Sequence, residues 1–133
     1  MNAFEKLLAE FDNELTFVFD KNIPDKLPGL ICDKTVYLNK DLPFDKAICV
    51  LSEEIGHYKT STPKDITDYR FNGKEERKAR NWGYKKLLPI DKLIKFIVKK
   101  ESVMPHELAE EFGITEEVAE EAVQMYRVKG ELD

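Results

Sequence analysis

The chain has 133 residues, of which 42% are hydrophobic and 35% are charged, and its formal net charge at pH 7 is -5. This length and composition are typical of a globular protein that buries one core without disulfides, and the negative charge disfavours nucleic acid as the main ligand. No apolar run approaches the roughly 20 residues that span a bilayer, and the first residues do not resemble a signal peptide, so we expect a cytoplasmic protein with no membrane association.

The first third of the chain predicts one helix followed by a small sheet. Apolar residues at helical spacing favour a helix over residues 2–11. Short apolar runs at residues 15–19, 30–32 and 35–38, separated by turn-forming residues, predict strands. The two residues between the last two runs suit a tight hairpin turn. We interpret this region as a mostly antiparallel sheet.

The rest of the chain predicts helices. They span residues 43–59, 74–87, 89–100, 105–112 and 115–128. Residues 60–73 hold too many turn-forming residues for regular structure, and we expect a loop that borders a cleft. The last two helices, joined by Gly113 and Ile114, have the spacing of a helix-turn-helix.

One motif in the helix at residues 43–59 carries chemistry: Glu53-Glu54-Ile55-Gly56-His57. In zinc peptidases with an HExxH motif, two ligands four residues apart face one ion and the glutamate between them activates water. Here Glu54 has the position of that general base and His57 that of the second ligand, while Glu53 replaces the first histidine. The same pattern occurs on acidic, solvated helices. The apolar residues upstream favour a buried helix, in which adjacent carboxylates are costly unless paired or metal-bound.

The sequence assigns no site role to the other reactive side chains. Cys32 and Cys49 lack the spacing of a disulfide or zinc site, so both are expected to be buried thiols. His106 begins a short helix far from the motif and is left outside the site. Tyr58 and Tyr84 could place a hydroxyl near a developing oxyanion, but their positions do not choose between them.

Taken together, these segments resemble the ImmA/IrrE family of metallopeptidases, in particular members from phages and mobile elements. The similar segments are a strand pair, the helix with the Glu-Glu-x-x-His motif, and a second helix in which a glutamate is followed by alanine three residues later and an aromatic residue six residues later. They cover residues 27–33, 36–39, 46–58, 60–61, 76–83 and 87–89.

The resemblance implies a site for zinc. It makes Glu54 the general base, His57 and Glu76 metal ligands, and Glu53 the occupant of the remaining ligand position, where it departs from the family's histidine. Glu75 is the competitor of Glu76, since both begin a charged helix. Only Glu76 lies three residues before Ala79 and six before the next tryptophan, as the pattern requires.

The resemblance also implies an α+β fold. We expect a minimal zincin-like metallopeptidase domain over residues 1–100, mostly helical with a small mainly antiparallel sheet, and a C-terminal helix-turn-helix-like pair over residues 101–133 packed on it. As a DNA reader this pair is disfavoured because Glu116, Glu117 and other glutamates crowd its second helix. We interpret it as a packing or partner-docking module.

The function implied by the resemblance is a metal-dependent endopeptidase. It would cleave a helix-turn-helix repressor of a phage or mobile element, using zinc-activated water with Glu54 as the general base. The alternative is a non-catalytic, repressor-binding (anti-repressor) protein on the same fold, in which Glu53 marks a reassigned site. A DNA-binding regulator is a third hypothesis, which rests on the C-terminal spacing alone and is opposed by the net charge.

Overall fold

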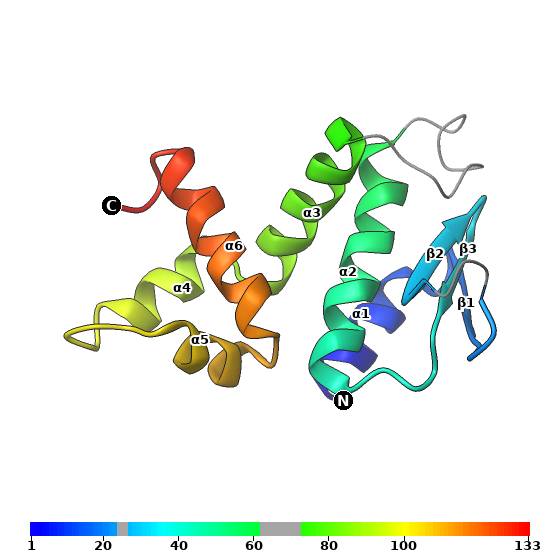
Figure 1. The fold of residues 1–133 in the computed structure, drawn as a ribbon, viewed down its shortest axis with the longest axis horizontal. Helices are drawn as coiled ribbons and strands as arrows, with labels where there is room; N and C mark the ends of the chain where they lie inside the picture. Colours follow the sequence, from blue (N-terminus) through cyan, green and yellow to red (C-terminus); the bar gives the residue numbers. More distant parts are fainter. Residues whose placement is uncertain (24–26, 62–72) are drawn as a thin grey trace.

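The computed structural model describes residues 1–23, 27–61 and 73–133 and has the expected α+β fold (Figure 1). The helices are α1 (Ala3–Phe11), α2 (Phe44–Thr60), α3 (Gly73–Leu87), α4 (Ile90–Ile97), α5 (Pro105–Phe112) and α6 (Glu116–Val128). The strands are β1 (Thr16–Phe19), β2 (Gly29–Cys32) and β3 (Thr35–Leu38). These bounds agree closely with the sequence prediction. The loop predicted at residues 60–73 falls mostly outside the described residues.

The three strands form a mixed sheet in the order β1-β3-β2. β2 and β3 are the expected antiparallel hairpin, whose turn places Asp33 at a φ of 57°, a region that aspartate tolerates better than most residues. β1 pairs with β3 in parallel, so the sheet is not mainly antiparallel. The reason is the connection between β1 and β2, which is too long for a tight hairpin and lets β2 pass to the far edge of the sheet.

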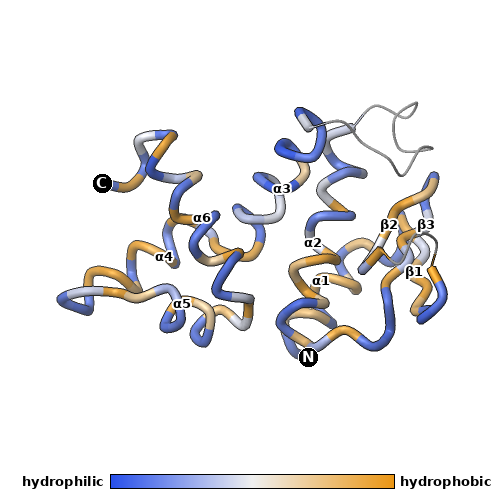
Figure 2. Tube along the Cα trace, in the orientation of Figure 1, coloured by the Kyte–Doolittle hydropathy of each residue, from blue (hydrophilic) through white to orange (hydrophobic). Residues whose placement is uncertain are grey.

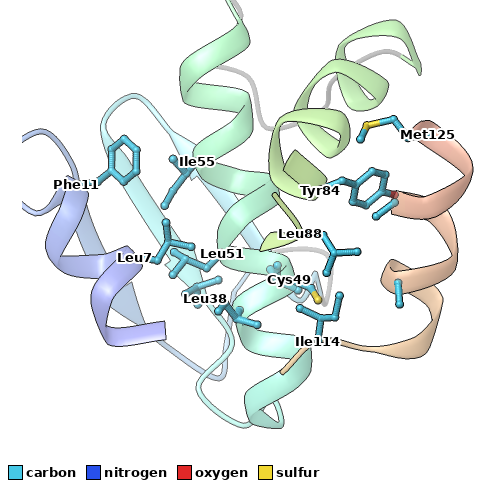
Figure 3. Packing of buried hydrophobic residues seen from close by; sticks show 14 of the residues in the cluster. Leu7, Phe11, Leu38, Cys49, Leu51, Ile55, Tyr84, Leu88, Ile114 and Met125 are labelled. Carbon is cyan, nitrogen blue, oxygen red and sulfur yellow. The ribbon is translucent and has the colours of Figure 1, made fainter. Parts of the chain in front are cut away.

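α2 is the central helix of the fold. The sheet and α1 pack on one side of it and α3 on the other, while α6 packs on α3 (Figure 1). Figure 3 shows Leu7 and Phe11 of α1 beside Leu51 and Ile55 of α2. On the other side, Leu88 lies between α3 and α6. All five of these residues belong to one continuous apolar cluster, so α2 is packed on both sides.

The two halves of α2 differ in polarity. Apolar residues predominate in its first half and polar residues in its second half, which lies beside the polar start of α3 (Figure 2). The polar half is nevertheless largely covered, since Glu54 and His57 are buried. Polar groups buried in this way need partners or a bound ion. Among the described residues, no helix is long and apolar enough to cross a membrane.

Of the two C-terminal helices, α6 packs against α3, and α5 packs on α6. The hydroxyl of Tyr126 on α6 donates a hydrogen bond of 2.7 Å to the carbonyl oxygen of Leu88. The hydroxyl of Tyr84 on α3 donates to the carboxylate of Glu121 on α6. These two hydrogen bonds join α6 to α3 and the residue that follows it. The division of the chain at residue 100 into a metallopeptidase domain and a C-terminal module stays a prediction.

α2 and α3 approach each other closely because small residues lie where they cross. A Cβ atom on Gly56 would lie 2.3 Å from the carbonyl oxygen of Ala79, and a Cβ atom on Gly83 would lie 2.8 Å from the hydroxyl oxygen of Ser52. Such distances are far below van der Waals contact. A larger residue at position 56 would therefore have to push α3 away from α2.

We expect Gly56→Ala to destabilise the protein by about 1–3 kcal/mol, because the added methyl group meets backbone atoms that cannot move aside alone. Chemical denaturation of the variant would measure the loss. Gly73→Ala is the matched control, since a Cβ atom there would meet no atom of the described residues within 4 Å. A Gly56→Ala variant as stable as the wild type would show that the close approach is not a constraint.

Candidate metal centre

The close packing of α2 on α3 brings two polar stripes face to face. Glu53 and His57 lie four residues apart on α2, and Glu76 and Arg80 lie four residues apart on α3. Residues at this spacing share one face of a helix. Because α2 and α3 touch at Gly56, the pair on α2 lies directly opposite the pair on α3.

Glu53, His57 and Glu76 form a group with the geometry of a metal site. Nε2 of His57 lies 3.2 Å from Oε1 of Glu76. One ligand atom from each of the three residues lies within 4.8 Å of the others, and this is the one such group among the described residues. Two ligand atoms of a tetrahedral zinc ion, each about 2.0–2.2 Å from it, are about 3.4 Å apart. The pair of His57 and Glu76 already has about this spacing, and a ligand atom of Glu53 lies within 4.8 Å of a ligand atom of each.

The donor set also fits a divalent metal. One imidazole nitrogen and two carboxylate oxygens leave a fourth position open, as catalytic zinc sites do. Glu76, and not its neighbour Glu75, is the member of this group on α3. These three residues are the ones that the sequence analysis expects as ligands, and their roles as metal ligands stay a prediction.

Arg80 is a member of the site that the sequence analysis missed. Its Nε donates a hydrogen bond of 3.1 Å to Oε1 of Glu53, and its Nη2 lies 3.8 Å from Oε2 of Glu76. The available signal was its position four residues after Glu76, the spacing of a helical ion pair. The contact with Glu53 crosses between helices, and no spacing in the sequence reveals it.

The two candidate ligand carboxylates have pKa values shifted in opposite directions. Burial raises the pKa of Glu53, and the charge of Arg80 opposes this effect. The pKa of Glu76 is lowered, chiefly by the hydrogen bond from His57. Glu76 therefore stays ionised over a wide pH range, as a metal ligand must.

Glu54 is the most buried carboxylate of the site, with 8% of its surface exposed. Burial raises its pKa well above the usual value, and the nearby charges of Glu53 and Glu76 raise the pKa further. A carboxyl group with a raised pKa binds a proton readily. This is the property that a general base near neutral pH requires.

A pocket of about 210 Å³ borders Glu53, Glu54 and Arg80. Residues of α2 and α3 line one side of it, and Thr115, which caps the start of α6, and Val118 of α6 line the other side. A carboxylate suited to proton transfer therefore opens onto a space that can hold part of a substrate. The start of α6 supplies one wall of that space, a role that the sequence did not suggest.

The two tyrosines considered as oxyanion donors are engaged elsewhere. The hydroxyl of Tyr58 donates a hydrogen bond of 3.1 Å to Glu14, near the end of α1. The hydroxyl of Tyr84 donates to Glu121, although the ring lines the pocket. Their hydrogen bonds tie α2 to the segment after α1 and α3 to α6.

The remaining reactive side chains are not members of the candidate metal group, although Cys49 lines the adjoining pocket. His106 is exposed on α5, as a residue without a site role is expected to be. Cys49 is buried on α2, as predicted. Cys32 is exposed, so the prediction of a buried thiol is wrong there. It is the last residue of β2, next to the hairpin turn, where it projects toward solvent.

Comparison with known protein families also supports a metallopeptidase-like site in this chain. A family model described as the IrrE N-terminal-like domain, a peptidase family, matches residues 9–124. Searches of curated proteins and of solved structures found no match to the chain. The matched residues include all of the candidate site.

We expect Glu54→Gln to raise the melting temperature of chelator-treated protein by a few degrees at pH 8 and by less at pH 5. The raised pKa of Glu54 means that its ionisation opposes folding, and this penalty grows as the pH rises above the usual pKa of a glutamate. Thermal melts at both pH values would measure the difference. An equal or lower melting temperature for the variant at pH 8 would contradict the burial of an ionisable group.

Proposed function

Because the chain belongs to the IrrE N-terminal-like (ImmA/IrrE) family of metallopeptidases, we propose that it is a zinc-dependent endopeptidase whose ligands are Glu53, His57 and Glu76. One observation carries the proposal. These three side chains converge from two helices beside the buried carboxylate of Glu54, and a pocket adjoins them. Carboxylate and imidazole donors next to a proton acceptor are the parts that hydrolysis of a peptide requires.

Each residue has a distinct task in the proposed reaction. A bound zinc ion would supply a Lewis acid that polarises the peptide carbonyl and makes water more acidic. Glu54 accepts the proton of the attacking water and returns it to the leaving amine, since its carboxylate borders the pocket and has a raised pKa. His57, held 3.2 Å from Glu76, fixes the position of that ligand before the ion arrives.

The substrate that we propose is a helix-turn-helix repressor of a phage or mobile element in the cytoplasm, whose cleavage would derepress silent genes. The resemblance of the sequence to this branch of the family supports the proposal. The acidic net charge of -5 suits a protein target better than DNA.

A second candidate is a non-catalytic protein that binds a repressor without cleaving it. The observation that favours it is the hydrogen bond of 3.1 Å between Glu53 and Arg80. A glutamate that stands in place of a ligand histidine and pairs with an arginine could belong to a site that no longer holds an ion. Metal content distinguishes the two candidates.

We expect the purified protein to bind about one zinc ion per chain, and Glu76→Gln to lose most of this affinity because one of three protein ligands is removed. Equilibrium dialysis with elemental analysis would measure both. Glu75→Gln is the matched control, because this neighbour is not part of the candidate group. Wild-type protein that stays metal-free in excess zinc would favour the second candidate.

We expect Glu54→Gln to retain zinc but to cleave a repressor from the same genetic element about 10²–10⁴ times more slowly, because an amide cannot accept the proton of water. Cleavage would be followed by gel electrophoresis and mass spectrometry, with zinc content measured on the same samples. Cleavage by the variant at the wild-type rate would exclude Glu54 as the general base.

A further inference from the structure

We propose that Arg80 competes with the metal ion for the carboxylates of Glu53 and Glu76, and thereby sets how tightly the site holds its ion. The inference rests on the proposed function, in which those two residues are ligands. It assigns a task to a side chain that neither the motif nor the family match singles out. Arg80 is a positioning residue in this account, because it acts on the ligands and not on the substrate.

The contacts of Arg80 reach both carboxylates at once. Nε lies 3.1 Å from Oε1 of Glu53, and Nη2 lies 3.8 Å from Oε2 of Glu76. The guanidinium group carries a permanent charge, and its planar fork of donors matches carboxylate oxygens. The side chains of Glu53 and Glu76 are 31% and 30% exposed, so water screens these pairs only in part.

The charge of the site explains why an arginine is placed there. Glu53, Glu54 and Glu76 put three carboxyl groups near one another on two touching helices. Among the described residues, the arginine or lysine side chain that forms ion pairs with these carboxylates is that of Arg80. It holds Glu53 and Glu76 together against the repulsion of their charges.

A divalent ion would take over the same task. When Glu53 and Glu76 coordinate a metal, their charge is shared between the ion and the guanidinium group, and the two cations repel each other. The pairing of Arg80 with the carboxylates is therefore stronger without the ion than with it. Coupling between two binding events is reciprocal, so Arg80 must weaken the affinity for the metal.

The competition depends on the carboxylate of Glu53. A histidine at position 53, as in the HExxH motif, is neutral when it binds zinc and offers Arg80 no carboxylate. The short contact of 3.1 Å would be lost, and the longer one to Glu76 would remain. The effect of Arg80 on metal affinity should therefore depend on which residue stands at position 53.

The test is a double-mutant cycle on zinc affinity, measured by competition with a chromophoric chelator. We expect Arg80→Gln to tighten the Kd for zinc on the order of 5- to 10-fold, and Arg80→Lys, which keeps the charge, to change it less. In the Glu53→His background, we expect Arg80→Gln to change the Kd by less than about 2-fold. Arg77→Gln, on an exposed arginine of the same helix, is the matched control.

A second measurement separates competition from a merely structural role. We expect Arg80→Gln to lower the melting temperature of chelator-treated protein and to have little effect on zinc-loaded protein. If Arg80 only supported the fold, Arg80→Gln would lower the melting temperatures of chelator-treated and zinc-loaded protein equally and would not tighten zinc binding.

Two results would overturn the inference while leaving the proposed function intact. In the first, wild-type protein binds zinc and Arg80→Gln binds it equally or more weakly. In the second, Arg80→Gln tightens zinc binding by the same factor when histidine stands at position 53. Wild-type protein that does not bind zinc would overturn the proposed function, and this inference with it.

Discussion

The contact of α2 with α3 at Gly56 is the constraint on which the candidate site depends. With no side chain at this position, α2 approaches the backbone of Ala79 to a distance that a Cβ atom would not allow. Glu53 and His57 then lie on either side of the contact along α2, opposite Glu76 and Arg80 on α3. The motif thus combines two requirements: its charged residues supply chemistry, and its glycine sets the distance over which that chemistry acts.

The same closeness creates an electrostatic problem. Glu53, Glu54 and Glu76 are brought together with limited access to solvent, and burial raises the pKa of Glu53 and Glu54. Ionised carboxylates in such surroundings need positive charge nearby. Arg80 supplies part of it, and a divalent ion would supply the rest. The fold holds these carboxylates together against their repulsion, and the site therefore favours the binding of a cation.

Local patterns predicted most of this structure, and long-range contacts account for what they missed. Periodicity located the helices and the hairpin, and spacing placed Glu53, Glu54 and His57 on one helix. Glu76 required the resemblance to a family, since nothing local distinguishes it from Glu75. The parallel pairing of β1 with β3 and the contact of Arg80 with Glu53 depend on how distant segments meet, as does the wall that α6 gives to the pocket. The spacing of residues along the sequence does not reveal contacts between such distant segments.

The position of a bound metal ion tests the proposed site most directly. Anomalous diffraction at the zinc edge, from crystals grown with zinc, would locate the ion without reference to activity. We expect one strong peak between the side chains of Glu53, His57 and Glu76, within about 2.0–2.2 Å of a nitrogen of His57 and an oxygen of Glu76. Zinc bound only at other residues, or a candidate site without a peak in crystals that contain zinc, would contradict it.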